Sequence, residues 1–330
     1  MKTTKFALIG AGFIGQVHAR NLAANPAIDF KYVADIDAAR AKQTGATFGA
    51  QAVSVDEVIG KDVDAVLIAS STNTHADLAE KCAAKGKAIY CEKPIDLSLE
   101  RVRKAVDAIG KAGVPFMIGF NRRFDQSHAA VESHVRAGEV GKIEIVQLTS
   151  RGPDVPPISY VKISGGQMRD QTIHFFDLLR WLTQDEPVEV FAMGDALIDP
   201  EVGKAGDVDT SIVSLRMSKG GFCQIDSSRR TKYGYDERLE VFGSEGMAES
   251  SRQQHRFSTV YKGKAIRNDG MHAGWFERVE ESYYSALDAF VRNIQGEKTT
   301  IPGLKDGLRA QIIADAAAES LKTGKPVKIS

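Results

Sequence analysis

The sequence predicts an N-terminal α/β domain with a doubly wound parallel sheet and a C-terminal α+β domain with a mainly antiparallel, open sheet. Three observations support this fold class. Short apolar runs alternate with helical segments over the first 120 residues, which is the pattern of parallel βαβ units. Extended segments then dominate the rest of the chain, as in an antiparallel sheet. A chain of 330 residues is also longer than most single domains.

The first domain is expected over residues 1–120, where each predicted strand is a short apolar run and each predicted helix follows a turn. The predicted strands are residues 6–9, 30–34, 63–69, 88–91 and 115–118. The predicted helices are residues 13–24, 37–44, 75–85 and 98–112, and Asn73 or Thr74 is the expected N-cap of the third. Strands separated by helices in this way predict one parallel sheet.

The second domain is expected over residues 121–330, where it binds the substrate and forms the subunit contacts. The predicted helices are residues 124–137, 170–182, 276–294 and 305–323, and the last is expected to pack back on the first domain. The predicted strands are residues 143–149, 188–198, 210–217, 222–228 and 238–243. Gly220-Gly221 predicts a hairpin turn between two of these strands.

Composition excludes several classes of protein. Lysine plus arginine and aspartate plus glutamate are equal, at 43 each, whereas a nucleic-acid partner requires a basic surplus. Three scattered cysteines form no disulfide framework, which favours a reducing compartment. The apolar run before Gly10 is too short for a signal peptide, and no run has the length of a membrane span. We expect a cytoplasmic protein with no membrane or nucleic-acid partner.

One strand suggests that the chain assembles with copies of itself. Residues 188–193 carry apolar side chains on both alternating faces, although a sheet face in water should be polar. Another subunit covering this face would explain the pattern, and a covering loop is the alternative. We expect a homo-oligomer, a tetramer formed through the C-terminal sheet.

A glycine motif near the N-terminus predicts a dinucleotide site. Gly10-Ala11-Gly12-Phe13-Ile14-Gly15 has the pattern G-x-G-x-x-G, follows a predicted strand and opens a predicted helix. Gly10, Gly12 and Gly15 permit a tight turn and the close approach of a pyrophosphate. Phe13 and Ile14 begin the helix, whose free N–H groups would face that pyrophosphate. The pattern is that of a Rossmann domain.

The charge at the end of the second strand favours NAD over NADP. Asp35 lies 20 residues after Gly15, where a carboxylate accepts hydrogen bonds from the ribose hydroxyls and repels a 2′-phosphate. Ile36 supplies no cation to offset this repulsion. Arg40 could soften the preference, but we expect it to be a solvated helix residue.

Polar residues follow two further strands at the edge where open α/β sheets bind ligands. Ser70, Asn73 and His75 are candidates to contact the cofactor, although a turn and a helix cap explain Asn73 equally well. Glu92 and Lys93 end the next strand and are candidates as well. Lys93 could also hydrogen-bond a substrate hydroxyl and stabilise negative charge on its oxygen. The alternative for Lys93 is a solvated residue at a strand end.

Asp170 and His174 lie four residues apart on one predicted helix of the second domain, so they would share a face. An imidazole accepts a proton from an alcohol near neutral pH, and a neighbouring carboxylate would hold it in place. Asp177, one turn further on, is a candidate to contact the substrate. A surface Asp–His pair is the alternative. The other histidines carry little signal: His18 lies in the first predicted helix, and we expect the remaining four to be solvated, namely His128, His134, His255 and His272. No HExxH motif or Cys/His cluster occurs, so no metal is expected.

These motifs together resemble the glucose–fructose oxidoreductase and inositol dehydrogenase family. The resemblance covers essentially the whole chain and includes Glu92-Lys93-Pro94 and Gly165-Gly166 followed by Asp170 and His174. More narrowly, three segments resemble inositol 2-dehydrogenases acting on myo- or scyllo-inositol. These segments are residues 119–125, residues 169–174 and residues 228–236.

The resemblance implies roles for individual residues. Lys93, Asp170 and His174 would form the catalytic set. Tyr235 would lie near the substrate, as would Asn121 and Arg122 at the domain boundary. Tyr283 matches a family tyrosine near the nicotinamide.

Two features depart from the family pattern. Many relatives have an acidic residue directly after the histidine, where this chain has Phe175. The proline-rich loop 151–157 is individual to this chain, and its Asp154 is a candidate to contact the substrate. Both features bear on which substrate is bound.

The implied reaction is NAD-dependent oxidation of a ring hydroxyl of inositol to the ketone (inosose), with His174 as the base and hydride transfer to nicotinamide C4. The same chemistry on an aldopyranose or another cyclic polyol is one alternative. A non-catalytic NAD-binding sensor is another. A sensor would need the glycine motif and Asp35 but not Lys93, Asp170 and His174 together.

Overall fold

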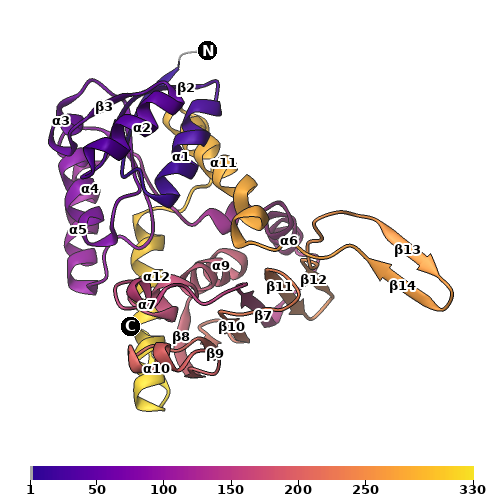
Figure 1. The fold of residues 1–330 in the computed structure, drawn as a ribbon. Helices are drawn as coiled ribbons and strands as arrows, with labels where there is room; N and C mark the ends of the chain where they lie inside the picture. The colour runs from indigo at the N-terminus through magenta and orange to yellow at the C-terminus, as the bar shows by residue number, and fades with distance from the viewer. Residues whose placement is uncertain (1–2) are drawn as a thin grey trace. The chain divides into compact units, whose positions relative to one another are not determined.

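The structure is a computed structural model that describes residues 3–330, and it divides into two compact units (Figure 1). Unit 1 comprises the chain up to Asn121 together with Ser282–Gln311, and unit 2 comprises Arg122–Glu281 together with Ile312–Ser330. The long helices α11 (Trp275–Ile294) and α12 (Leu304–Thr323) each contribute to both units.

Unit 1 contains a six-stranded parallel sheet in the order β3-β2-β1-β4-β5-β6. Its strands are β1 (Thr4–Ile9), β2 (Ile28–Ala34), β3 (Gln51–Val53), β4 (Ala65–Ile68), β5 (Ala88–Cys91) and β6 (Phe116–Ile118). Its helices are α1 (Phe13–Ala24), α2 (Ala38–Phe48), α3 (Val55–Gly60), η1 (Thr72–Thr74), α4 (His75–Ala83) and α5 (Leu99–Ala112). The strand order reverses between β1 and β4, where doubly wound sheets bind their ligands.

Helix α11 contributes part of the core of unit 1. The ring of Phe290 packs edge-on against Phe6 of β1 and Tyr90 of β5, with ring centroids 6.3 Å and 5.8 Å away. All three side chains are fully buried. This aromatic contact ties a C-terminal helix to the parallel sheet.

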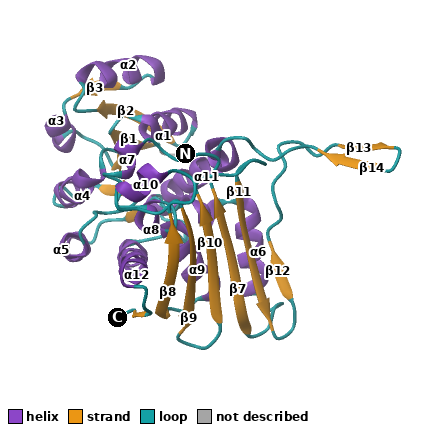
Figure 2. Ribbon diagram, turned by 60° about the horizontal axis from the view of Figure 1, so that its bottom comes forward, coloured by secondary structure: helices purple, strands orange, loops and turns teal. Residues whose placement is uncertain are grey.

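Unit 2 contains a seven-stranded sheet in the order β12-β11-β7-β10-β9-β8-β15 (Figure 2). Its strands are β7 (Ile143–Arg151), β8 (Pro187–Asp195), β9 (Thr210–Met217), β10 (Phe222–Ser228), β11 (Asp236–Gly243), β12 (Met247–Glu249) and β15 (Val327–Lys328). Its shorter helices are η2 (Asn121–Phe124), α6 (Gln126–Arg136), α7 (Ile158–Val161), α8 (Gln167–Asp170), α9 (Ile173–Thr183) and α10 (Pro200–Lys204). Only β7 and β10 pair in parallel. The predicted fold class is confirmed.

The strands of this sheet alternate between buried and exposed side chains, as period-2 geometry requires. In β9 the buried positions are Ser211, Val213, Leu215 and Met217. On the other face several large apolar side chains are exposed. These are Ile145, Met193, Ile212, Phe222, Phe242 and Met247.

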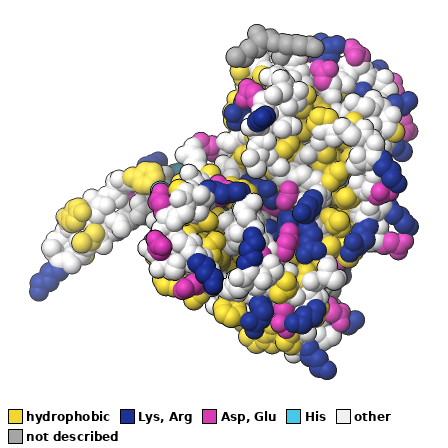
Figure 3. Space-filling model, turned by 180° about the vertical axis from the view of Figure 1, so that it is seen from behind, with side chains coloured by type: hydrophobic (Ala, Val, Ile, Leu, Met, Phe, Trp, Pro, Cys, Tyr) yellow, Lys and Arg dark blue, Asp and Glu magenta, His cyan; other side chains and the backbone are white. Residues whose placement is uncertain are grey.

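A hairpin that the sequence did not reveal extends away from the sheet of unit 2 (Figures 1 and 2). It consists of β13 (Thr259–Lys262) and β14 (Ala265–Asn268), and every residue of both strands is exposed. Figure 3 shows hydrophobic side chains along this arm and basic side chains at its end. Among residues 3–330, none of the helices has the length and apolar character needed to cross a bilayer.

Candidate active site

The glycine loop between β1 and α1 is shaped by close packing. Gly10 has φ +96°, and a Cβ atom there would lie 2.5 Å from the backbone of Ala69 and Ser70. A Cβ on Gly15 would lie 2.1 Å from the carbonyl oxygen of Gly10. Glycine is therefore required at both positions, because a side chain would push β1, β4 and α1 apart.

Gly12 differs from the other two because it faces open space. Its two chain neighbours aside, no described heavy atom lies within 4 Å of a Cβ placed on Gly12. Gly12 is the N-cap of α1, where no side chain caps the helix and no acidic residue occupies the first turn. Phe13 is exposed and Ile14 is half-buried. Uncapped N–H groups beside open space fit a pyrophosphate.

Asp35 follows β2 and is bound to the same loop. Its carboxylate accepts hydrogen bonds from the backbone N–H of Ala11 at 2.7 Å and of Asp37 at 2.8 Å. A carboxylate has further acceptor sites for ribose hydroxyls, so this geometry fits NAD. Arg40 lies 3.6 Å from Asp35 and 3.5 Å from Asp37. Arg40 is exposed on α2, as expected of a solvated helix residue, and it also lies beside these two carboxylates.

The candidates after β4 have different surroundings. Asn73 is exposed, and the hydroxyl groups of Ser70 and Thr74 are 2.7 Å apart. His75 is buried, and its ring nitrogens lie 2.8 Å from the carbonyl oxygen of Pro94 and 3.0 Å from that of Ser70. His75 thus links two strand-end loops of unit 1. Its direct contact with the cofactor stays a prediction.

Glu92 is buried beneath the strand end rather than exposed at it. Its carboxylate lies 2.8 Å from Nε2 of His18 and accepts a hydrogen bond from the backbone N–H of Lys93 at 3.2 Å. A Cβ on Gly119 would lie 2.8 Å from this carboxylate. Burial alone would raise the pKa of Glu92, but the hydrogen bond and charge of His18, together with the charges of Lys93 and His75, lower it. Glu92 therefore helps to fix the backbone of Lys93, and its cofactor contact stays a prediction.

His18 and Tyr283 complete this buried cluster. The ring of His18 packs edge-on against Tyr283 and Tyr90, at centroid distances of 5.5 Å and 5.3 Å. Lys93 itself is half-buried, and its peptide bond to Pro94 is cis. His18, which carried little signal in the sequence, is the buried partner of Glu92. The expectation that His128 is solvated was wrong, because its side chain is fully buried.

The predicted helix over residues 170–182 is interrupted between Asp170 and His174. Helix α8 ends at Asp170, and α9 begins at Ile173. The N–H of Thr172 donates to the carbonyl oxygen of Gln167, five residues back, which is a π-type turn. The expectation that Asp170 and His174 lie on one continuous helix was therefore wrong, and their pairing stays a prediction.

Two residues hold the carboxylate of Asp170. The hydroxyl of Tyr160 donates to it at 2.9 Å, and the guanidinium of Arg229 lies 3.6 Å away. Arg229 is buried and also lies 3.7 Å from Asp207. His174 is buried at the start of α9. Asp170 thus lies among polar groups, with the guanidinium of Arg229 between two carboxylates.

Arg122 and Tyr235, both candidates to contact the substrate, meet at Glu237. The hydroxyl of Tyr235 donates to the Glu237 carboxylate at 2.6 Å, and Arg122 donates to it at 3.1 Å. All three side chains are buried. Burial and the negative charge of Glu237 raise the pKa of Tyr235. The network keeps the phenol protonated and able to donate a hydrogen bond.

The remaining candidates are placed as follows. Asp177 is fully buried and forms a two-point ion pair with Arg123, in which Nε donates at 2.7 Å. The side chain of Asn121 donates to the hydroxyl of Ser282 at 2.8 Å, and Asp154 is exposed on the loop after β7. A substrate hydroxyl would have to compete with Arg123 for Asp177. The predicted substrate contacts of Asp177, Asn121 and Asp154 therefore stay predictions.

Both units match domains of one protein family. Residues 4–120 match the oxidoreductase family with an NAD-binding Rossmann fold, and residues 128–249 match the GFO/IDH/MocA C-terminal domain. The chain belongs to the GFO/IDH/MocA oxidoreductase family. The resemblance drawn from the motifs and the expectation of an NAD-dependent oxidoreductase are confirmed.

Individual members of the family are similar over their full length. An inositol 2-dehydrogenase of Rhizobium meliloti is 40% identical over 329 residues, covering 99% of this chain and 100% of the relative. A crystal structure of a myo-inositol dehydrogenase from Corynebacterium glutamicum has a TM-score of 0.94 at 38% identity, covering 99% of both chains. A scyllo-inositol dehydrogenase from Lactobacillus casei, with bound NAD(H) and scyllo-inositol, has a TM-score of 0.92 at 26% identity, covering 99% of both.

The partners of the candidates that were not identified from sequence include Glu237, Tyr160 and His18. Glu237 had a usable signal, because it lies two residues after Tyr235 and hence on the same face of an extended chain. Tyr160 and His18 had none, since their partners Asp170 and Glu92 are 10 and 74 residues away.

Proposed function

We propose that the protein is an NAD-dependent inositol dehydrogenase that oxidises one ring hydroxyl of myo- or scyllo-inositol to the ketone. The observation that carries the proposal is its full-length similarity to inositol 2-dehydrogenases, at 40% identity for the relative from Rhizobium meliloti. The open space beside Gly12 and the carboxylate of Asp35 support NAD as the cofactor.

In this proposal three side chains act on the reacting hydroxyl group. His174 accepts the hydroxyl proton, and Lys93 donates a hydrogen bond to the same oxygen as negative charge develops on it. When bound, the nicotinamide accepts the hydride from the carbon. Asp170 is held by Tyr160 and Arg229, and it orients the imidazole and offsets its positive charge after proton transfer.

The substrate ring would be recognised by buried polar groups. Tyr235 and Arg122 both donate to Glu237, so in this proposal the phenol oxygen of Tyr235 accepts a hydrogen bond from a ring hydroxyl that the base does not touch. A site lined by buried polar groups favours a polyol over an apolar alcohol, because an apolar substrate would exclude water from these groups without offering hydrogen bonds in return.

Absorbance of reduced nicotinamide, followed over a panel of inositols, aldopyranoses and aldonates, tests the proposal. We expect the highest kcat/KM with an inositol, and a loss of about 10²- to 10⁴-fold in His174→Ala and Lys93→Ala. The exposed His134 and Lys104 provide matched controls, and His134→Ala and Lys104→Ala should keep wild-type turnover.

The panel also separates the alternatives. Highest activity with an aldopyranose would replace inositol as the substrate and leave the mechanism in place. Tight NAD binding without turnover of any compound would favour the sensor. Wild-type turnover in both His174→Ala and Lys93→Ala would overturn the proposed roles of these residues.

We further propose that copies of the chain assemble into a tetramer through the open face of the seven-stranded sheet. The strand registers place Met247, Phe242, Ile145 and Phe222 in one continuous row across four neighbouring strands. All four are exposed, and an exposed apolar row of this kind is typical of a protein–protein interface, which supports contact with a second copy. Light scattering should give a tetramer for the wild type and a smaller species for the double variant Phe222→Ser/Phe242→Ser. A monomeric wild type would contradict the proposal.

The proposed compartment is the cytoplasm. Cys82, Cys91 and Cys223 are all buried and free, as expected where thiols stay reduced. Cell fractionation of the source organism followed by immunoblotting would test this, and recovery outside the cytoplasm would contradict it.

A further inference from the structure

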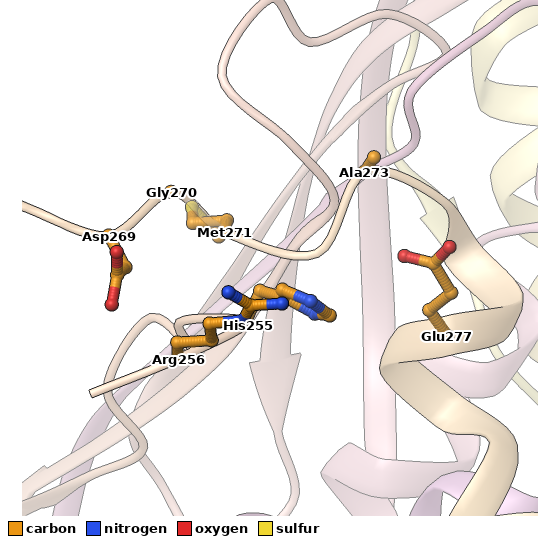
Figure 4. A pocket seen from close by; sticks show the side chains of 7 residues that line it. All are labelled: His255, Arg256, Asp269, Gly270, Met271, Ala273 and Glu277. Carbon is orange, nitrogen blue, oxygen red and sulfur yellow. The ribbon is translucent and has the colours of Figure 1, made fainter. Parts of the chain in front are cut away.

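Two histidines and a glutamate of unit 2 lie together beside a cavity at the base of the β13–β14 hairpin. One potential ligand atom from each of His255, His272 and Glu277 lies within 4.8 Å of the other two. The cavity has a volume of about 440 Å³, and His255 and Glu277 line it (Figure 4). We propose that these three side chains bind a divalent transition-metal ion of the zinc type.

The backbone at both histidines is fixed by hydrogen bonds. The N–H of His255 donates to the carbonyl oxygen of Gly270 at 2.9 Å, and the carbonyl oxygen of His272 accepts from the N–H of Tyr235 at 2.8 Å. Gly234 allows this contact, because a Cβ there would lie 2.8 Å from the same His272 oxygen. Two of the three ligands are therefore held by strand-like pairing rather than by mobile loops.

The third ligand comes from the first turn of α11. Glu277 precedes Arg278, which is buried and forms an ion pair with Asp125 at the N-terminus of α6. This pair fixes the start of α11 within unit 2. Figure 4 shows the carboxylate of Glu277 on the cavity side of the helix and the side chain of His255 extending into the same region. An ion here would link the hairpin base to α11.

The donor set decides the kind of metal. Two imidazoles and one carboxylate form a common zinc ligand set that leaves one position open, whereas calcium and magnesium prefer all-oxygen ligands. Tetrahedral bonds of about 2.0–2.1 Å place ligand atoms about 3.3 Å apart. The ligand atoms lie within 4.8 Å of one another, and rotation of the exposed His255 and Glu277 side chains would bring them to that separation.

The surroundings favour a cation. The charged side chains that line the cavity are Arg256, Asp269 and Glu277, so the lining carries one net negative charge while the histidines are neutral. Nδ1 of His272 is buried and has no hydrogen-bond partner among residues 3–330, which is uncommon for a buried polar atom without a bound ligand or water.

Titration of the untagged, chelator-treated full chain with Zn²⁺ and Co²⁺ tests the proposal. Calorimetry should give one ion per chain, and bound Co²⁺ should show the intense visible absorption of a four-coordinate site. His255→Ala, His272→Ala and Glu277→Gln should each weaken binding by tenfold or more. His134→Ala is the matched control, because His134 forms an exposed pair with Glu139 without a second histidine, and it should bind like the wild type.

The melting temperature provides a second readout that does not depend on enzyme activity. Zn²⁺ should raise the melting temperature of the wild type in proportion to the logarithm of its concentration and leave that of His255→Ala unchanged. His255 is exposed, so its replacement should not prevent folding. Binding to the wild type no tighter than to the double variant His255→Ala/His272→Ala would overturn the proposal.

Discussion

The buried ion pair between Arg123 and Asp177 predicts a large loss of folding stability when either partner is replaced, because both side chains are buried. The two side chains are 8% and 1% exposed, so water cannot solvate either charge if the other is removed. Asp177→Asn preserves the shape but leaves the guanidinium without a counter-charge. Removing one partner of such a pair costs about 3–5 kcal/mol. We expect about 3 kcal/mol for Asp177→Asn, because the amide oxygen still accepts one of the two hydrogen bonds.

Guanidinium-induced unfolding followed by tryptophan fluorescence is the appropriate assay. Trp181 and Trp275 both lie in unit 2 with the ion pair, so the signal reports on the unit that is perturbed. The double variant Arg123→Met/Asp177→Leu, which removes both charges, should be more stable than Asp177→Asn.

Glu100→Gln provides the matched control for a charge-to-amide change. Glu100 pairs with Lys104 on the surface of α5, where both side chains are largely exposed, and exposed pairs contribute little. We expect no measurable change in unfolding free energy. If Asp177→Asn behaves like Glu100→Gln, or if the double variant is the least stable of the three, the reasoning from burial is refuted.

Three further predictions concern unit 1. Gly15→Ala should lower the melting temperature in a thermal-shift assay, because the added Cβ would overlap the Gly10 oxygen. Gly12→Ala should fold normally but bind NAD more weakly, which calorimetry can measure. Asp35→Ser should move the ratio of kcat/KM for NAD over NADP toward NADP by tenfold or more, since the repulsive carboxylate is removed; an unchanged ratio would contradict its role. The pKa of Glu92 is lowered from 4.5 in the folded protein, so its ionised form stabilises the fold above pH 4.5 and this contribution is lost as the pH falls below that value. Acid titration monitored by circular dichroism should therefore show a shallower loss of stability in Glu92→Gln than in the wild type.

The position of the dinucleotide loop and the alternation of strands and helices in unit 1 could be predicted from sequence because they depend on local information. Helix α1 was predicted with its observed bounds, Phe13–Ala24, since a glycine motif precedes it and an asparagine follows it. The hairpin β13–β14 could not be predicted, because its strands are four residues each and exposed on both faces. A strand without a buried face shows no alternation of apolar and polar residues.

In the candidate site, too, some features could be predicted from the sequence and others could not. Motifs identified Lys93, Asp170, His174 and the glycine loop, because each lies close to the end of a strand or of a helix that a local pattern marks. The partners of these residues were decided by the tertiary structure. Glu237 joins Tyr235 to Arg122 across 115 residues of sequence, and no local pattern encodes such a distance.

The sequence by itself therefore determined the family, the cofactor domain and the residue types available for proton transfer, because these are written in short motifs at fixed spacing. Only the tertiary structure decided that the helix breaks between Asp170 and His174, and that His255, His272 and Glu277 meet at one cavity. The break depends on the hydrogen bond from Thr172 to Gln167, which competes with regular helix geometry. The cluster forms because the β13–β14 hairpin brings the segments before and after it together. The helix break and the side-chain cluster both depend on which backbone groups form hydrogen bonds with each other once the chain is folded.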